Sequence, residues 1–367
     1  MGSRLLKLWL LIALLVLTAW SPAAHRMTAD VGLGPNLSSI GPLTFGPDGT
    51  LFAADPQAAA IFAVDLGAFA IGGAAGAKDI PAIDQKIAAM LGTNAREIAV
   101  TDLAVHPRTH NAFLSVMRGQ GAGAAPVLFR IDGAARIEMV ALQNLKYSKV
   151  TLPNAPDINS TNPRNTRTQS VTDMAFADGR LYVAGLSNEE FSSKLRSIPY
   201  PFSSADRGTS VEIFHGNHGQ LETRSPVYAL VPYTVNNTPH LIAGYLCTPL
   251  VKFPLSSLTP GAKVRGTTIA ELGNRNRPLD MVLYRKDGKE FLLMSNNNRG
   301  VMKIPTARFG DAAPITSPVA GETQGVPYET ITTMKGIEQL DLLDAQNTLV
   351  LARAEKGTLN LEVVPLP

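Results

Sequence analysis

The stretch that decides the fold is LDMVLYRKDGKEFLLMSNNNRGVMKI, residues 279–304. Apolar and polar residues alternate over 279–284 and again over 290–295, and Lys286-Asp287-Gly288-Lys289 lies between the two runs. An Asp-Gly pair between alternating runs predicts a β-hairpin. A polar loop at 296–300 and a further apolar run at 301–305 extend this hairpin to three strands.

Similar units occur along the whole chain. Their first strands begin near residues 43, 102, 173, 227, 279 and 339. Repeats of roughly 40–50 residues with several strands each are typical of propeller blades, and longer spacings require insertions. The sequence therefore predicts an all-β fold, a six-bladed β-propeller.

Several departures from the repeat add detail to this prediction. A short amphipathic helix on the rim is expected after Asp79 as its cap, with Gly92 at its end. Insertions at 152–170 and 187–207 are expected to cover the same mouth of the central channel, with 211–215 as the third strand of the third repeat. A strand at 28–33 is expected to complete the last blade, because ring closure removes an exposed sheet edge.

Composition narrows the classes of partner. The net charge is +3, and no Lys/Arg run marks a basic groove, so a nucleic-acid partner is not expected. The 31 glycines and 26 prolines suit a turn-dense β protein.

The first residues have the layout of a secretory signal peptide. Arg4 and Lys7 precede the apolar run 8–17, and small residues follow at 21–24. We expect a leader over 1–24, a single propeller domain over 25–367, a secreted or periplasmic location, and no stable membrane insertion after cleavage. The alternative is an uncleaved membrane anchor, although the run is shorter than the ~20 residues that span a bilayer.

Cys247 is the single cysteine of the chain, which excludes an internal disulfide. A lone thiol in an exported protein is either a small buried hydrophobe or a reactive group or soft-metal ligand.

Acidic residues occur at the start of the innermost strand in four of the six repeats. They are Asp102, Asp173, Asp280 and Glu338, whereas Pro42 and Pro226 hold this place in the first and fourth repeats. Inner strands surround the propeller axis, so these side chains should converge. Carboxylates brought that close must be protonated, paired with cations or bound to a metal ion.

Three interpretations of these acids remain open. They could accept hydrogen bonds from loop backbone N–H groups. They could form buried ion pairs with Arg118, Arg167, Arg277 or Arg299. They could hold Ca²⁺ or another divalent cation as a cofactor, with carbonyl oxygens from Asn154, Asn188, Asn276 and Asn296.

Loop residues on the same face are candidates for contact with a ligand. They are Asn154, Arg167, Asn188, Glu189, Arg277, Asn296 and Arg299.

A second cluster lies at His215-Gly216-Asn217-His218-Gly219. Two histidines three residues apart can bind one transition metal, but the glycines favour an exposed hairpin turn on the far face of the propeller. The chain has no G-x-S-x-G motif, P-loop or dinucleotide fingerprint, so nucleophilic catalysis has little support.

At GPLTFGPDGTLFAAD (41–55) and VTDLAVHP (100–107) the chain resembles six-bladed propellers of the NHL and SMP-30/gluconolactonase-like types. The resemblance extends over most of the mature chain. In the lactonase members, acidic and amide side chains near the axis hold a divalent cation that polarises a carbonyl or activates water. It implies metal-ligand roles for Asp102, Asp173, Asp280 and Glu338, although Pro42 stands where those enzymes place a Glu. The motifs SNEEF (187–191), CTPLVKFP (247–254) and ELGNRNRPLDM (271–281) resemble exported bacterial propellers without an assigned activity.

Three functions follow as hypotheses. The first is a non-catalytic module that binds a small molecule or protein outside the cytoplasm at the channel mouth. The second is a divalent-metal-dependent hydrolase of lactones or esters. The third is a sugar dehydrogenase with a bound quinone.

Overall fold

The stretch that predicts the fold forms three antiparallel strands. β19 (Pro278–Lys286), β20 (Lys289–Asn296) and β21 (Gly300–Pro305) pair in this order. The β19–β20 hairpin turns at Asp287 and Gly288, whose φ angles are +50° and +73°. Two consecutive positive φ angles are the mark of a type I′ turn, whose twist matches that of the paired strands.

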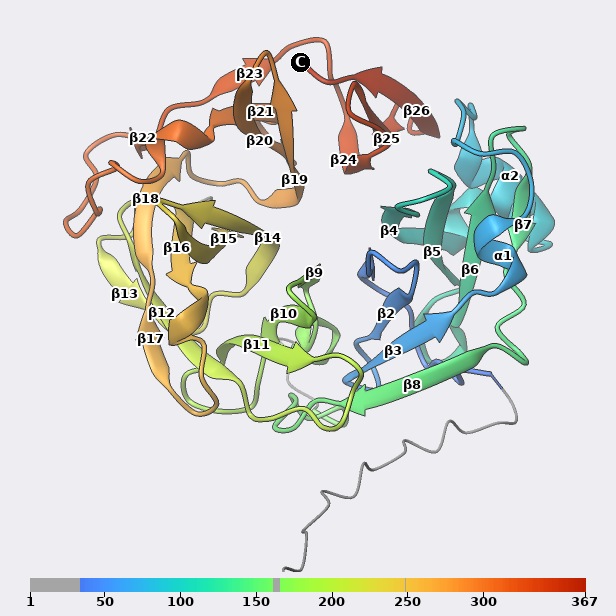
Figure 1. Cartoon of the computed structure of the whole chain (residues 1–367), viewed down its shortest axis with the longest axis horizontal. Coiled ribbons are helices and arrows are strands. Elements are labelled where there is room, and N and C mark those ends of the chain that lie inside the picture. Colours follow the sequence, from blue (N-terminus) through green and yellow to red (C-terminus); the bar gives the residue numbers. More distant parts are fainter. Residues whose placement is uncertain (1–33, 161–165, 248) are drawn as a thin grey trace, which may run out of the picture.

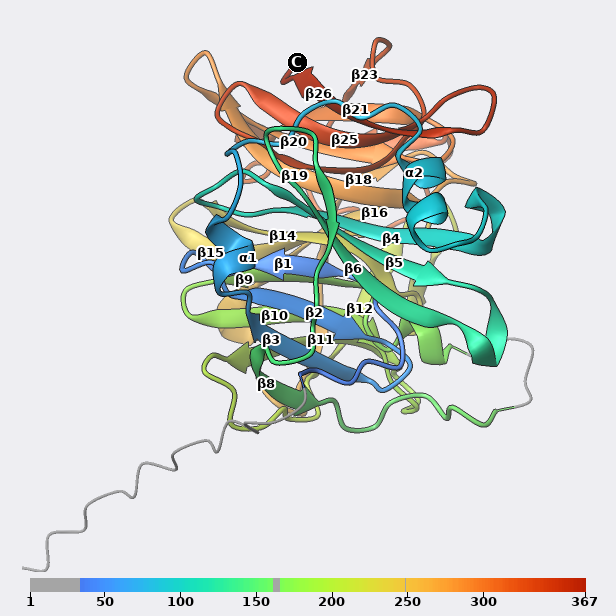
Figure 2. The same cartoon turned by 90° about the vertical axis from the view of Figure 1, so that its right-hand side faces the viewer.

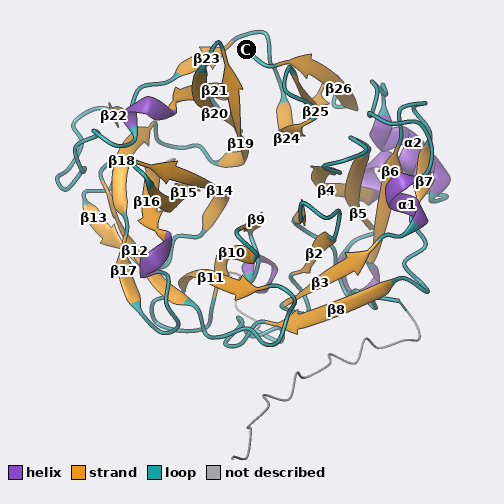
Figure 3. Ribbon diagram, in the orientation of Figure 1, coloured by secondary structure: helices purple, strands orange, loops and turns teal. Residues whose placement is uncertain are grey.

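A computed structural model describes residues 34–160, 166–247 and 249–367, which form six sheets around one axis (Figures 1 and 3). The predicted six-bladed β-propeller is confirmed. We number the blades by the chain order of their innermost strands. Blade 1 contains β1 (Leu43–Phe45), β2 (Leu51–Asp55), β3 (Ala60–Asp65) and β8 (Lys146–Thr151). Blade 2 contains β4 (Ile98–Val105), β5 (Ala112–Arg118), β6 (Ala125–Ile131) and β7 (Ile137–Met139).

The other four blades follow along the chain. Blade 3 contains β9 (Asp173–Ala177), β10 (Arg180–Leu186), β11 (Ser193–Pro199), β12 (Thr209–His215) and β13 (Gln220–Glu222), and β17 (Lys263–Arg265) pairs with β12 in parallel. Blade 4 contains β14 (Val227–Val235), β15 (Thr238–Tyr245), β16 (Pro249–Pro254), β18 (Thr267–Leu272) and β22 (Thr323–Gly325). Blade 5 contains β19, β20, β21 and β23 (Glu329–Ile331), and blade 6 contains β24 (Ile337–Leu342), β25 (Asn347–Arg353) and β26 (Leu359–Pro365).

The blades do not follow one another around the ring in chain order (Figure 1). Strand β1 lies between β4 and β9, and β4 also lies beside β24. The order around the ring is therefore 1, 3, 4, 5, 6, 2. After β3 the chain passes to blade 2 and then returns with β8, which pairs with β3 as the outermost strand of blade 1. Blades 1 and 2 are thus tied together by two chain crossings.

The ring closes between blades 6 and 2 through the connection that follows β3. Ile80 and Leu361 form an antiparallel bridge, with N–H···O distances of 2.8 and 3.0 Å, and Asp79 Oδ1 accepts a hydrogen bond from Val363 N at 2.6 Å. The edge of β26 is therefore covered from this connection. The strand predicted at 28–33 lies outside the described residues, as does the leader at 1–24.

The predicted rim helix is present, but its start differs from the prediction. The structure has α1 (Ala68–Ile71) and α2 (Ile83–Met90), both on the outer side of blade 2 (Figures 1 and 2). Asp79 does not cap α2, because its carboxylate binds Val363 N, and α2 starts after Ala82, which has a φ of +52°. Short 3₁₀ turns lie at η1 (Ala95–Glu97), η2 (Gly121–Gly123), η3 (Arg167–Gln169), η4 (Leu255–Ser257) and η5 (Thr306–Arg308). None of the helices in the described part of the chain is long and apolar enough to cross a membrane.

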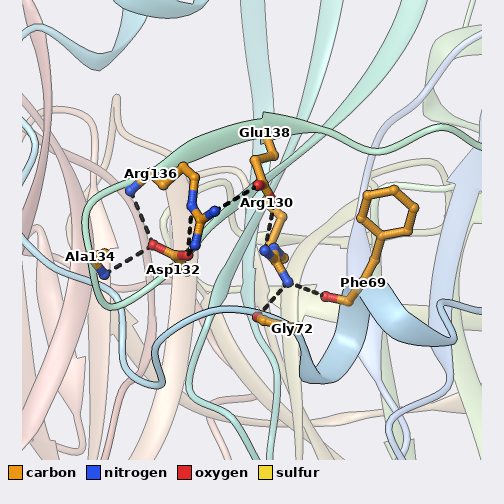
Figure 4. Close-up of polar contacts among 7 residues, drawn as sticks. All are labelled: Phe69, Gly72, Arg130, Asp132, Ala134, Arg136 and Glu138. Atoms are coloured by element: carbon orange, nitrogen blue, oxygen red, sulfur yellow. Dashed lines mark hydrogen bonds and ion pairs between the residues drawn. The ribbon is translucent and has the colours of Figure 1, made fainter.

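A buried arginine fixes the chain crossing to blade 2 (Figure 4). Arg130 Nη1 on β6 donates to the carbonyl oxygens of Phe69 and Gly72 at 2.8 and 2.6 Å, and Nη2 binds Glu138 Oε2 at 2.5 Å. Asp132, in the next turn, accepts a hydrogen bond from Ala134 N at 2.9 Å. Only 4% of this side chain is exposed, and both terminal nitrogens of its guanidinium meet acceptors.

The prediction of a long insertion at 187–207 in the third repeat is wrong. Residues 193–199 form β11, the third strand of blade 3, and 209–215 form the fourth, β12. The charged residues of SKLRSIP (193–199) favoured a loop, but Lys194 and Arg196 are each only 1% exposed. Lys194 Nζ pairs with Glu189 and donates to Ser210 Oγ at 2.7 Å, so its charge is compensated inside the blade.

Closure through Ile80 can be tested with a cross-link. In an antiparallel pair that exchanges both hydrogen bonds the Cα atoms lie about 5.5 Å apart, within the range of a disulfide. We expect Ile80→Cys with Leu361→Cys, in a Cys247→Ser background, to oxidise to a form that migrates faster on non-reducing gels. That form should need more denaturant to unfold than the reduced protein. Ile71→Cys with Leu361→Cys is the control, and no cross-link in the first pair would contradict this closure.

Candidate functional site

Four aspartates from four blades border the central channel. Asp102 is on β4, Asp173 on β9, Asp280 on β19 and Asp341 on β24. Together with the neighbouring inner-strand residues they line a cavity of about 390 Å³. The structure thus brings three of the four acids named from the sequence to one place, and it adds a fourth, Asp341.

Each of these carboxylates accepts backbone hydrogen bonds. Three accept from the next residue of their own strand, all at 2.7 Å: Met174 N to Asp173, Met281 N to Asp280 and Leu342 N to Asp341. All four accept from the inner strand of a neighbouring blade: Leu43 N to Asp102 at 2.6 Å, Leu230 N to Asp173 at 2.6 Å, Leu340 N to Asp280 at 2.9 Å and Val105 N to Asp341 at 2.7 Å. The geometry matches the hydrogen-bonding interpretation of the acids, with strand rather than loop donors.

These bonds join the blades in one direction around the ring. They run from blade 3 to 4, from 5 to 6, from 6 to 2 and from 2 to 1. In two of the blades the preceding threonine adds a second contact. Thr101 Oγ1 donates to Ile40 O at 3.0 Å, and Thr172 Oγ1 donates to Val227 O at 2.5 Å. A Thr-Asp pair therefore binds one carbonyl and one N–H of the neighbouring blade, from residues three apart in the chain.

Glu338 does not join the channel aspartates. Its carboxylate forms a two-point ion pair with Arg353, with Nη2···Oε2 at 2.7 Å, and its side chain is 39% exposed. A β-bulge between Ile337 and Gln339 gives Gln339 the register position that Asp102 and Asp280 hold in their strands. With its amide oriented to satisfy its neighbours, Gln339 Nε2 donates to Asp102 Oδ1 at 2.8 Å and to Asp280 Oδ2 at 3.0 Å.

Asp341 lies near the end of β24 rather than at its start, so the pattern of acids at strand starts did not predict it. The usable signal was the residue after the acid: each channel aspartate is followed by Leu or Met, at 103, 174, 281 and 342. The carboxylate of Asp341 reaches the inner strand of blade 2, where it accepts from Val105 N.

Burial dominates the electrostatics of the channel. It raises the pKa of Asp173 to about 7 and that of Asp341 to about 6. It also raises the pKa of Asp102 and Asp280 well above the ordinary value, and repulsion from the other channel aspartates adds to this rise. Hydrogen bonds from backbone N–H groups favour the ionised forms but do not outweigh the loss of water.

The raised pKa values predict that stability falls as pH rises from about 4 to about 7. Over this range the native protein binds more protons than the unfolded chain, so the free energy of unfolding decreases with pH. We expect the free energy of unfolding of Asp173→Asn to decrease less steeply with pH. Any loss of stability that the amide causes equally at all pH values does not change this slope. Denaturant titrations at several pH values, with Glu338→Gln as the control, measure it.

Two outcomes would contradict this prediction. One is an unchanged slope in Asp173→Asn. The other is stabilisation by Ca²⁺ above pH 7 that is lost in the variant, which would establish the divalent-cation interpretation of the channel instead.

Removal of one carboxylate should expose its structural role. We expect Asp341→Ala to lower the free energy of unfolding by about 2–4 kcal/mol, because it leaves the N–H groups of Val105 and Leu342 buried without an acceptor. Glu338→Ala, in the same strand, should cost less than about 1 kcal/mol because its ion pair is partly exposed. Equal losses in the two variants, measured by chemical denaturation, would refute this assignment.

A larger hollow of about 980 Å³ lies at the mouth of the channel where the inner strands begin. Its wall includes Pro42, Thr101 and Thr172 from three blade entries. The insertion at 152–170 contributes Ile158, Thr168 and Gln169, as its predicted position requires. The segment 187–207 does not contribute to the described lining, and its residues 193–199 form β11.

Arg277 is the candidate ligand residue that lines this hollow. Its guanidinium lies over the ring of Tyr228, 5.1 Å from the centroid, and the Tyr228 hydroxyl accepts a hydrogen bond from Gln169 Nε2 at 3.2 Å. A cation over an aromatic face is held in place while its outer N–H groups stay available.

The other candidate ligand residues have internal partners. Asn154 Nδ2 donates to Glu189 Oε1 at 2.9 Å, and the backbone N–H of Asn188 donates to the backbone oxygen of Asn154 at 2.8 Å, while the Asn188 residue is exposed. Arg167 donates to the carbonyl oxygens of Gln57 and Pro156, both at 2.8 Å.

Asn296 ends β20, and Arg299 lies in the turn that follows it. Asn296 Oδ1 accepts a hydrogen bond from Arg299 N at 3.0 Å, and the Arg299 guanidinium binds Glu322 Oε2 at 2.5 Å. These two residues and the four above mainly order loops, so Arg277 is the member of the predicted set that the structure presents at the mouth.

Comparison with solved structures shows similarity of fold alone. The PQQ-bound aldose sugar dehydrogenase from Streptomyces coelicolor is 11% identical, with a TM-score of 0.33 and coverage of 92% of this chain and 97% of that chain. The hydrazine synthase of Kuenenia stuttgartiensis is 11% identical, with a TM-score of 0.38 and coverage of 91% and 97%. An exo-1,5-α-L-arabinanase from a bovine ruminal metagenomic library is 12% identical, with a TM-score of 0.38 and coverage of 73% and 93%.

No protein-family model matches the chain, and the curated proteins give no match. The activities of the structural neighbours are therefore not transferred to this chain.

Proposed function

We propose that this protein is a non-catalytic binding module whose ligand is held at the channel mouth. The observation that carries the proposal is the hollow of about 980 Å³, into which the inner-strand entries and the 152–170 insertion converge around Arg277 and Tyr228. Long ordered loops on a rigid β scaffold commonly form binding sites. A hollow of this size accommodates a small organic molecule.

The lining indicates the chemistry of the ligand. Apolar side chains such as Ile40 and Val171 alternate with amides and hydroxyls such as Gln57 and Thr168. Arg277 is the single charged side chain among the described residues of the wall. A small hydroxylated molecule with one carboxylate fits this set, because an arginine fork binds a carboxylate with charge-assisted hydrogen bonds.

The same lining favours binding over catalysis. Among the described residues that border the hollow there is no Asp, Glu, His, Cys or Lys, the side chains that most often serve as general acids, bases or nucleophiles. The channel aspartates lie in a separate cavity, and their oxygens accept backbone hydrogen bonds.

Each of the two enzymatic hypotheses can be tested by a separate measurement. A lactonase-type hydrolase requires a stoichiometric divalent cation at Asp102, Asp173 and Asp280, which metal analysis of the purified protein would detect. A quinone-dependent sugar dehydrogenase requires a quinone absorption band. An exported or periplasmic setting, consistent with residues 1–24, would place any of these functions outside the cytoplasm.

Arg277 provides the test of the binding proposal. We expect gluconate or glucuronate to bind at least about tenfold more tightly than glucose or mannitol in calorimetric titrations. Arg277→Gln should remove this preference, because it deletes the charge that the carboxylate meets.

Arg275→Gln is the matched control, because Arg275 is also exposed and lies two residues away but outside the lining. Equal binding of acids and neutral sugars, or an unchanged preference in Arg277→Gln, would overturn the proposal.

A further inference from the structure

The His215–Gly219 turn is neither exposed throughout nor on the far face. His215 is only 1% exposed, and His218 is 41% exposed. The turn lies beside Cys247, which follows the end of β15. That end of β15 pairs with the start of β14, where Tyr228 borders the mouth, so the cluster is on the same face as the mouth but farther out from the axis.

Three potential metal ligands meet here. One ring nitrogen of His215, one of His218 and the Cys247 Sγ all lie within 4.8 Å of one another. The two imidazole rings are in contact, with centroids 3.7 Å apart. A tetrahedral Zn²⁺ with Zn–N of about 2.0–2.1 Å and Zn–S of about 2.3 Å separates its ligand atoms by about 3.5 Å. Small rotations of the half-exposed His218 side chain and of the Cys247 side chain would bring the three ligand atoms to this separation.

A shared carboxylate orients both rings. Glu222 Oε1 lies 2.6 Å from His218 Nδ1, and Glu222 Oε2 lies 3.0 Å from His215 Nδ1. A carboxylate at Nδ1 leaves Nε2 as the nitrogen for a metal, which is the usual arrangement of metal-binding histidines.

The Nε2 atom of the buried His215 ring has no hydrogen-bond partner within the described structure. Glu271 Oε2, its nearest ion-pair oxygen, is 3.8 Å away, whereas Nδ1 lies 3.0 Å from Glu222 Oε2. A buried polar atom without a partner is costly, so the retention of Nε2 here points to a ligand.

The charges around the cluster also favour a cation. Glu271 is fully buried, and its oxygens accept from Gly216 N at 2.6 Å and from Asn217 Nδ2 at 3.1 Å. Glu222 and Glu271 find only histidines as ion-pair partners in the described part of the chain. A thiolate would add a third negative charge, which a divalent ion would offset.

Gly216 lets the loop approach this carboxylate. A Cβ at this position would lie 3.1 Å from Glu271 Oε1 and 2.6 Å from a methyl of Val319. The sequence at the turn is therefore suited to holding Glu271 against the two histidines.

We propose that His215, His218 and Cys247 bind one borderline-soft divalent cation, Zn²⁺ in preference to Ca²⁺, with Glu222 as the positioning residue for both rings. Nitrogen and thiolate ligands select such ions, whereas Ca²⁺ takes oxygen ligands. Glu271 or water completes the coordination. The site is separate from the channel mouth and does not depend on the ligand proposed there.

Cobalt substitution tests the proposal on the full chain. Metal-free, reduced protein titrated with Co²⁺ should bind one equivalent, develop a thiolate-to-cobalt charge-transfer band and lose the band on addition of Zn²⁺. Cys247→Ser should abolish the band, and His218→Ala should weaken Co²⁺ binding at least about 100-fold. Glu222→Gln should weaken it about 10–100-fold, as loss of an outer partner does.

The thiol gives a second readout. One equivalent of Zn²⁺ should slow the labelling of Cys247 by a thiol reagent at least about tenfold, and Ca²⁺ should not. His110→Asn is the control histidine, because Asn tolerates the positive φ of position 110.

Failure of Cys247→Ser to fold would leave the decision to His218→Ala, whose side chain is 41% exposed. A charge-transfer band that persists in Cys247→Ser, equal affinity in His218→Ala, or no Co²⁺ binding by the wild type would overturn the site.

Discussion

The ring depends on half-buried carboxylates around the axis, which accept hydrogen bonds from N–H groups of the next blade. The innermost strand of every blade is an edge strand, so one row of its backbone groups has no sheet partner. Four aspartates supply acceptors to that row at four of the six junctions. An aspartate is short enough to stay beside its own strand and has two oxygens, so it can also accept from the following residue.

Placing four carboxylates around the axis has an electrostatic cost. Carboxylates in a cavity of about 390 Å³ lose much of their hydration, which raises their pKa values. Gln339 reduces the conflict because its amide lies between two of them and donates to both. The axis is therefore occupied with holding blades together, while the wider hollow above it is free of acidic side chains among its described residues. The His and Cys cluster forms a third region, farther from the axis.

The ring order shows how such a repeat chain can be tied without a disulfide. Blade 2 is inserted between β3 and β8 of blade 1, and its entry segment also covers the edge of blade 6. Arg130 fixes this segment through carbonyl oxygens of Phe69 and Gly72. Three blades thus meet through one connection, so separation of any one of them disturbs the others. The single Cys247 is left available for other chemistry.

Much of the fold could be read from local pattern. Asp287-Gly288 and its counterparts specify hairpins, and alternation specifies which strand faces are buried, because both effects act between residues close in the chain. Asp102, Asp173 and Asp280 could be predicted to converge because they hold similar places in similar repeats, which is also a local pattern.

Tertiary structure alone decided the rest. Six similar blades do not reveal in which order they adjoin, so the placement of blade 1 between blades 2 and 3 depends on contacts between distant segments. Gln339, not Glu338, holds the register position of Asp102 and Asp280, and the carboxylate that reaches Val105 comes from Asp341, farther along the same strand. Lys194 lies inside a blade because Glu189 and Ser210 compensate its charge there, and His215 meets Cys247 across two blades. Each of these outcomes depends on a partner far away in the sequence, which periodicity and spacing do not identify.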